Sequence, residues 1–303
     1  YQERGYRAKD IPALILQKNL FGMEIDDRAA QLAAFALMMK ARADDRRIFD
    51  SEAKPNILAF EDSQGMKASE IHFALTSPLK GEKEGELESP APDGHLFESD
   101  DNLFTRAEAA KAAASRTPTT VNFSQADIAS LLELFENAKT FGSLIQVPPK
   151  LAAKLPEIEK RLDDVLKFGD LTHASAHVLT PLLQQARLLA RQYDAVVANP
   201  PYMGGKGMYV PIKNFAKQFF PRTKADLFAV FMERSFGLLQ PEGRLGMVAM
   251  QSWMFLSSYE KLRVSLLSQT NIECMAHMAN MVMGIAFGTA ATIFKNHKTS
   301  GIK

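Results

Sequence analysis

The stretch Asp194-Ala195-Val196-Val197-Ala198-Asn199-Pro200-Pro201-Tyr202 decides the fold class of this chain. The apolar, β-rich run over 194–198 predicts a buried strand, and Asn-Pro-Pro-Tyr follows where that strand ends. In open α/β sheets, ligands bind outside the carboxyl ends of the strands. The two prolines fix their own φ angles and hold each preceding residue in an extended conformation. We therefore predict a stiff loop at the ligand-binding edge of an α/β sheet.

This loop presents groups that suit the methylation of an exocyclic amine. That reaction needs acceptors aimed at the N–H bonds, and the Asn199 side-chain oxygen and the Pro200 carbonyl can supply them. The Tyr202 ring can lie against the flat face of a base and replace the stacking lost when the base leaves a duplex. No strong general base is needed, because the proton leaves late. The competing interpretation is a rigid proline turn without a catalytic role.

Strand and helix patterns on both sides of the loop support an α/β fold. The N-terminal part predicts a helix end at 11–19, a strand at 20–25, a helix at 29–43 and a strand near 56–60. After a loop at 199–210 we expect a helix at 225–239, a strand at 244–250, a helix near 257–268, a strand near 271–276 and a hairpin at 279–295 with its second strand at 289–294.

The middle of the chain differs in composition from both ends. Residues 78–103 are rich in Glu, Pro, Gly and Ser, which predicts a loop or a disordered linker. Leu, Ile and Phe at helical spacing predict helices at 124–140 and 151–192, and thus a helical insertion. We expect four parts: 1–75 and 193–303 as the two halves of the α/β domain, 76–122 as the linker and 123–192 as the insertion.

Composition limits the classes of function. The 303 residues include 46% hydrophobic and 23% charged side chains, as in globular proteins. With 36 basic and 35 acidic side chains, any contact with nucleic acid must come from local patches. Cys274 is the only cysteine, so we expect a reduced, cytoplasmic setting and no disulfide framework. No apolar run is long enough for a membrane span. His173 and His177 have a metal-binding spacing without a third ligand nearby, so we expect no metal site.

Three stretches resemble the gamma-type N6-adenine-specific DNA methyltransferases, in particular the PglX-like enzymes of BREX phage-defence systems. They are NPPYMGGKGM at 199–208, QSWMFLSSYEKLR at 251–263 and KNLFGMEIDDRAAQLAAFALMMKAR at 18–42. The resemblance covers about 1–60 and 150–300. It implies a Rossmann-like S-adenosylmethionine-dependent methyltransferase sheet with a helical insertion. The implied substrate is a flipped adenine in double-stranded DNA, the cofactor is S-adenosyl-L-methionine, and other BREX defence proteins are the implied partners.

The resemblance also assigns roles to individual residues. Glu24, or Asp26 in its place, matches the acid that binds the ribose hydroxyls of the cofactor, a role that suits a carboxylate. Asp226 and Phe228 match a helix that lines the cofactor pocket. Phe287 matches an aromatic residue that stacks on the second face of the flipped adenine. Apart from the resemblance, Lys206 in a glycine-rich loop suits a DNA phosphate, and a mobile surface loop is the alternative. Glu61 or Asp62 loosely matches an acid that contacts the adenine.

Two family elements have no counterpart in these 303 residues. The first strand, with its glycine-rich cofactor turn, is expected before residue 1, and a target-recognition domain is expected after residue 303. We therefore expect a sheet without its middle strand, and a chain that by itself binds cofactor weakly and is inactive. Two alternatives stay open: a methyltransferase for protein glutamine or RNA, and a catalytically incompetent interaction subunit of a defence complex.

Overall fold

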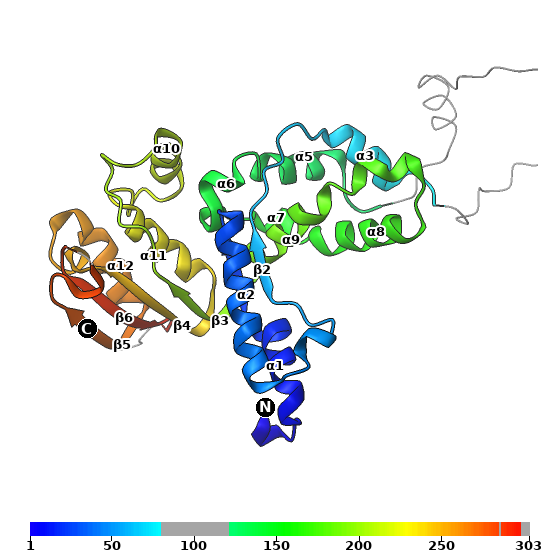
Figure 1. Ribbon diagram of the computed structural model, residues 1–303. Helices are drawn as coiled ribbons and strands as arrows, with labels where there is room; N and C mark the ends of the chain where they lie inside the picture. Colours follow the sequence, from blue (N-terminus) through cyan, green and yellow to red (C-terminus); the bar gives the residue numbers. More distant parts are fainter. Residues whose placement is uncertain (80–120, 285, 298–303) are drawn as a thin grey trace, which may run out of the picture. The chain divides into compact units, whose positions relative to one another are not determined.

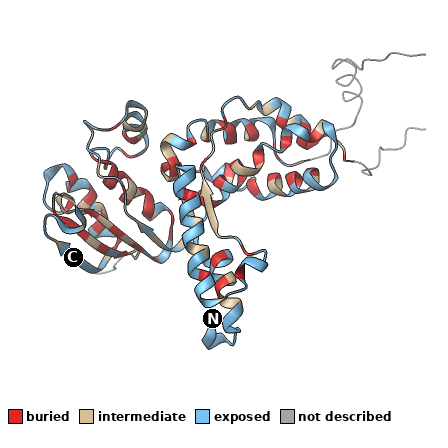
Figure 2. Ribbon diagram, viewed as in Figure 1, coloured by how far each residue is buried: buried red, intermediate tan, exposed pale blue. Residues whose placement is uncertain are grey.

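The computed structural model describes residues 1–79, 121–284 and 286–297. These residues form two compact units (Figure 1). The sheet unit contains residues 1–60, 139–146 and 188–303, and the helical unit contains 61–138 and 147–187. Each unit contains buried residues, most of them apolar, alongside exposed ones (Figure 2).

The first half of the sheet unit is a parallel β-α-β arrangement. Strand β1 (Phe21–Glu24) leads into helix α2 (Asp27–Asp44), and strand β2 (Asn56–Ala59) pairs with β1 in parallel, with Glu24 opposite Ala59. Asp26 starts α2 because its carboxylate accepts hydrogen bonds from the amides of the first turn. The shorter helices are η1 (Gln2–Arg4), η2 (Ala8–Asp10), α1 (Ile11–Leu14), η3 (Ile15–Asn19) and η4 (Ile48–Asp50). The elements predicted at 20–25, 29–43 and 56–60 are present.

The second half of the sheet unit is a four-stranded sheet in the order β3-β4-β6-β5. Strands β3 (Tyr193–Ala198) and β4 (Leu239–Met250) are parallel, and β6 (Thr289–Lys295) runs antiparallel to both β4 and β5 (Asn271–Met278). The helices are α10 (Val210–Phe219), α11 (Leu227–Gly237), α12 (Glu260–Gln269), η7 (Gln251–Met254), η8 (Ser257–Tyr259) and η9 (Val282–Gly284). Alternate strand residues such as Leu245, Met247 and Phe294 pack into the core with α11 and α12.

The sheet of this unit is in two pieces. Strand β1 pairs only with β2, and β3 pairs only with β4, so within the described residues one edge of β1 and one edge of β3 have no strand partner. Val197 in β3 is 85% exposed, although the apolar run over 194–198 predicts a buried strand. The rings of Phe21 and Tyr193 lie 5.7 Å apart at the start of the two strands. The open edges present backbone N–H and C=O groups with which a further strand can pair.

The helical unit contains α3 (Ala68–Thr76), α5 (Gln125–Leu134), α7 (Pro149–Ala152), α8 (Leu155–Phe168), η6 (Leu171–Ala176) and α9 (Leu179–Ala190), the last of which ends in the sheet unit. Buried Arg161 donates to the carbonyls of Leu75 and Ser77, where α3 ends. Buried Gln185 bonds both the amide and the carbonyl of Glu61.

The division into units differs from the expected one at two places. Helix α3 packs on α5 and α8, so residues 61–75 belong with the helices and not with the first half of the α/β domain. Residues 139–146, which include the end of α6 (Ala138–Phe141) and η5 (Gly142–Leu144), belong to the sheet unit. Most of the expected linker at 76–122 lies outside the described residues. Its described start is packed, because Ser77 and Leu79 are buried.

His173 is buried, with Nδ1 beside the Asp170 carboxylate and Nε2 beside the carbonyl of Ser77. Among the described residues, no three His, Cys, Asp or Glu side chains gather to hold an ion. None of the described helices combines the length and apolar character that crossing a bilayer requires.

Candidate active site

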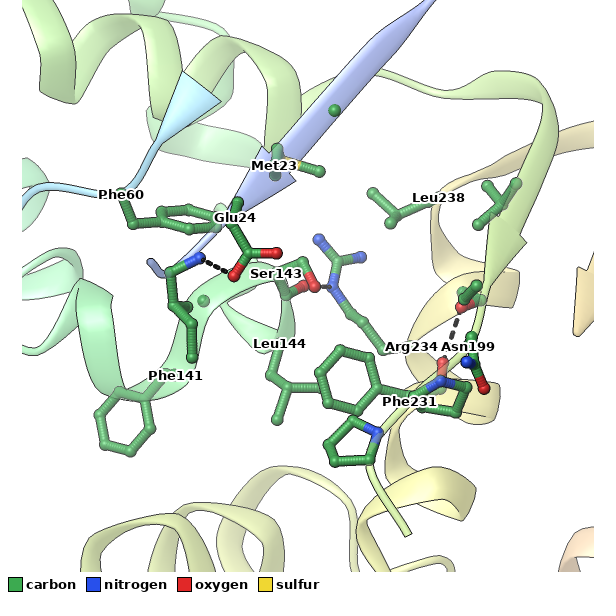
Figure 3. Close-up of a pocket in the computed structure, with 18 of the residues that line it drawn as sticks. Met23, Glu24, Phe60, Phe141, Ser143, Leu144, Asn199, Phe231, Arg234 and Leu238 are labelled. Carbon is green, nitrogen blue, oxygen red and sulfur yellow. Dashed lines mark hydrogen bonds between the residues drawn. The ribbon is translucent and has the colours of Figure 1, made fainter. Parts of the chain in front are cut away.

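A cavity of about 550 Å³ opens in the sheet unit between the unpaired edges of β1 and β3. Its walls come from four places: β1, the segment 140–144, the end of β3 with the following loop, and the inner face of α11. Most of the lining side chains are apolar. The polar exceptions among the residues labelled in Figure 3 are Glu24, Ser143, Asn199 and Arg234.

The Asn-Pro-Pro-Tyr loop borders this cavity. Asn199, Pro200 and Pro201 line it where β3 ends, and Glu24 lines it where β1 ends. Figure 3 shows Glu24 and Asn199 on opposite sides of the space, with the Arg234 guanidinium between them. Both residues stand at the carboxyl ends of parallel strands, which is where the α/β architecture places ligands. The structure therefore brings Glu24 and Asn199 to the same cavity.

Glu24 and Asp26 have different roles in the structure. One carboxylate oxygen of Glu24, Oε1, accepts from the amides of Ile25 (2.8 Å) and Asp26 (3.1 Å). This orients the carboxylate and leaves Oε2 available to a ligand. The Oδ1 of Asp26 instead accepts from the amides of Arg28 and Ala29 as the N-cap of α2. Asp26 is not among the residues that line the cavity.

Tyr202 is held by its hydroxyl and by two other rings. The hydroxyl lies 3.2 Å from Oδ1 of Asn199 and 3.1 Å from the carbonyl of Val248 in β4. Burial raises the pKa of the Tyr202 phenol. The ring makes edge-to-face contacts with Phe228, at 6.4 Å between centroids, and with Phe287, at 5.8 Å. The two rings proposed for the faces of a base are therefore neighbours, although in this structure they touch edge to face.

Asp226 and Phe228, which were expected to contact the cofactor, do not line the cavity in this structure. Phe228 has no exposed surface and lies in the core of the four-stranded sheet. Asp226 is buried as the N-cap of α11, where Oδ1 accepts from the amides of Met203 and Phe228. Desolvation raises the pKa of its carboxyl despite these hydrogen bonds. The helix lines the cavity with Leu227 and Phe231 instead.

Lys206 is exposed in a loop that is anchored at both ends. Gly204 forms a bridge with Asp226, the Gly205 amide donates to the carbonyl of Ala225, and the Leu227 amide donates to the carbonyl of Met203. The glycine-rich segment is therefore pinned beside the start of α11, and it carries the lysine outward. The short helix α10 that follows was not predicted. Its proline at the N-terminal end and apolar residues at 212, 215, 216 and 219 are signals that could have revealed it.

The sequence analysis did not identify Arg234 or residues 140–144 as part of the cavity wall. Arg234 is buried on α11 and donates from Nε to the carbonyl of Ser143 and from Nη2 to those of Ile145 and Leu189. Desolvation lowers the pKa of its guanidinium to about 10. Phe141 stacks on Phe215 of α10 at 4.3 Å. No local pattern connects residues 140–144 with α11, because these contacts arise only through tertiary packing.

Two curated relatives match the whole chain. It is 42% identical over 308 residues to the adenine-specific methyltransferase BrxX of Escherichia coli O9:H4 (strain HS), and the match covers 100% of the chain and 24% of BrxX. It is 31% identical over 305 residues to the adenine-specific methyltransferase PglX of Lacticaseibacillus casei (strain Zhang), covering 99% of the chain and 22% of PglX. The chain therefore spans about a quarter of the length of these relatives.

A solved structure of the type ISP restriction-modification enzyme LlaGI, a nuclease-deletion mutant in complex with a DNA substrate mimic, is a distant match. It is 14% identical, covers 44% of this chain and 13% of that chain, and has a TM-score of 0.30.

The parallel β-α-β units and the Asn-Pro-Pro-Tyr loop opposite a strand-end carboxylate define a Rossmann-like methyltransferase domain. The chain belongs to the Eco57I restriction-modification methylase family, whose model matches residues 18–282.

Proposed function

We propose that the protein containing this chain transfers a methyl group from S-adenosylmethionine to the N6 amino group of an adenine flipped out of double-stranded DNA. The observation that carries the proposal is that Asn199, Pro200 and Glu24 line one cavity. Both curated relatives bear the name adenine-specific methyltransferase, which supports the choice of target atom. The resemblance to BREX proteins supports a role in phage defence, with other proteins of such a system as partners.

The residues around the cavity suit S-adenosylmethionine. Glu24 has one carboxylate oxygen fixed by two amides and the other available, an arrangement that accepts hydrogen bonds from a ribose diol. Ile25, Phe60 and Leu144 supply apolar surface near it for an adenine ring. The bound cofactor would supply the methyl group. The cavity includes the space between the open edges of β1 and β3, so its volume is larger than that of the cofactor site alone.

The loop after β3 acts on the target amine. Asn199 Oδ1 and the Pro200 carbonyl are acceptors for the two N–H bonds, which directs the nitrogen lone pair toward the methyl donor. When the Tyr202 hydroxyl donates to the carbonyl of Val248, Asn199 Oδ1 is free to accept from the substrate. The Tyr202 ring supplies the stacking surface for the extruded base.

A planar base fits this site better than a glutamine side chain. Phe287 lies beside Tyr202, so two aromatic rings border the position of the target amine. A pair of rings gives stacking energy to a base, and gives little to an aliphatic amide.

Transfer of tritiated methyl groups by the full-length protein tests this proposal. The cofactor is offered with duplex DNA, RNA and a glutamine-containing peptide in separate reactions. We expect label in DNA, and none above background in RNA or peptide. Label confined to the peptide or to RNA contradicts the proposal. S-adenosylmethionine binding by calorimetry, measured on residues 1–303 and on the full-length protein, separates an incompetent subunit from a truncation effect, because a true interaction subunit binds in neither form.

A further inference from the structure

The segment that follows β4 contains a glutamine whose side chain lies against the backbone beside Phe287. Gln251 is the first residue of η7, and its backbone N–H donates to the carbonyl of Gly288 over 3.1 Å. Its side-chain Oε1 is hydrogen-bonded to Nε2 of His277, near the end of β5. Gln251 therefore connects β4, β5 and the residue immediately before β6.

Gly288 leaves the space that the Gln251 side chain occupies. A Cβ atom on Gly288 would lie 2.5 Å from Cδ and Nε2 of Gln251 and 2.6 Å from Oε1. The backbone of Gly288 is outside the left-handed region, so its φ angle does not require glycine. The close approach of Gln251 is what requires it.

Phe287 needs a fixed backbone because its ring has to move when a base enters. The Phe287 and Tyr202 rings are 5.8 Å apart and inclined by 70°. A base sandwiched between parallel rings needs roughly 7 Å between them, or two stacking steps of about 3.4 Å. Phe287 is 38% exposed, so its ring has room to turn. The ring must therefore rotate and withdraw by about an ångström while its backbone stays in place.

We propose that Gln251 and His277 are a positioning pair for Phe287, holding the backbone at Gly288 so that the ring closes on the target base at stacking distance. The proposal rests on the proposed function and adds a determinant of how the flipped adenine is held. Neither residue touches the reacting atoms. The hydrogen bond from His277 holds the Gln251 side chain in place, and that side chain packs against Gly288.

The test uses the full-length protein and single-turnover methylation of duplex DNA. Gln251→Ala and His277→Ala each remove the same hydrogen bond. We expect each to lower the rate constant roughly tenfold or more, because catalysis is sensitive to misplacement of about 1 Å. The KM for S-adenosylmethionine and the Tm should not change. Gln251→Glu keeps an oxygen acceptor for His277 and should retain most of the rate.

Gly288→Ala provides an independent perturbation with a built-in control. The added Cβ displaces the Gln251 side chain, so the single variant should lose rate as Gln251→Ala does. The double variant Gly288→Ala/Gln251→Ala removes the overlap and should be no slower than Gln251→Ala alone. Gly246→Ala is the matched control, since its Cβ meets nothing closer than Val197 Cγ2 at 3.9 Å.

A second readout reports base holding directly. With 2-aminopurine at the target position, extrusion raises fluorescence and stacking on the rings quenches it. The Gln251→Ala complex should therefore be brighter than wild type, because the base still leaves the duplex and is stacked less well. Wild-type rates and fluorescence in the Gln251 and His277 variants, or additive losses in the double variant, overturn the positioning role. A wild-type protein that methylates no DNA overturns the proposed function, and this inference with it.

Discussion

The hydroxyl of Tyr202 lies 3.2 Å from Oδ1 of Asn199, so the last residue of the Asn-Pro-Pro-Tyr loop is a hydrogen-bond partner of the first. The same hydroxyl lies 3.1 Å from the carbonyl of Val248. One hydroxyl hydrogen satisfies one acceptor fully, so the tyrosine divides its donation between the loop and strand β4. The loop is thereby tied to strand β4 beside Asn199.

Removal of this hydroxyl should slow catalysis while leaving the fold intact. We expect Tyr202→Phe to lower the methylation rate about fivefold, the equivalent of about 1 kcal/mol from one lost hydrogen bond. The ring remains, so stacking on the base is preserved. Tyr209→Phe is the matched control, because Tyr209 is 65% exposed. Equal rates for Tyr202→Phe and wild type would show that the hydroxyl does not orient Asn199.

Substitution of Glu24 should change cofactor affinity, whereas substitution of Asp26 should change the stability of the fold. Glu24→Gln removes the charge available to a ribose diol, and we expect S-adenosylmethionine to bind roughly ten- to a hundredfold more weakly in the full-length protein. Asp26→Ala removes the N-cap of α2 and should cost about 1 kcal/mol of unfolding free energy while cofactor affinity is unchanged. Calorimetry and urea unfolding measure the two effects. The assignment is reversed if Asp26→Ala weakens cofactor binding and Glu24→Gln does not.

The buried carboxyl of Asp226 predicts a pH-dependent difference in stability. Burial raises its folded-state pKa above the unfolded value, so the carboxylate costs stability as the pH rises through that window. Asp226→Asn keeps an oxygen for the Met203 amide and carries no charge. The unfolding free energy of Asp226→Asn minus that of wild type should therefore be larger at about pH 7 than at about pH 4. Urea unfolding of both proteins at the two pH values measures this, and a constant difference contradicts it.

Lys206 should contribute to DNA affinity without contributing to sequence preference. We expect Lys206→Ala in the full-length protein to weaken binding to all duplexes alike, and to reduce the slope of log K against log salt by about 1. Lys261 on α12 is an exposed lysine for comparison. Titrations at several salt concentrations decide the matter. An unchanged slope removes Lys206 from the DNA contact.

The strands and the loop that carry the site could be predicted from sequence because their signals are local. An apolar run before Asn199 and another before Glu24 each predict a strand, and both residues stand where those strands end. That the two strand ends face one cavity follows from the parallel arrangement of an α/β sheet. The sequence does not distinguish a pocket position from a core position for Phe228, because an apolar residue in a helix suits both.

The other wall of the cavity could not be predicted in this way. Phe141 and Leu144 follow a helical region and return to the sheet unit only through packing on α10 and α11. The hydrogen bonds of Arg234 go to three backbone carbonyls, which any residue type can supply, so the sequence does not indicate that Arg234 is buried there. Contacts of a side chain with distant backbone leave no pattern in the amino-acid sequence. For the same reason the sequence does not reveal that α3 packs with the helical unit, and not with the first part of the α/β domain.

Single-molecule mapping of modified bases, in cells that carry the full-length protein with and without Asn199→Ala, tests most directly whether Asn199 holds the target amine. We expect N6-methyladenine at one class of non-palindromic site with the wild-type protein, and its loss with the variant. An identical methylation map for both proteins would contradict the assignment of Asn199 as the acceptor that holds the target amine.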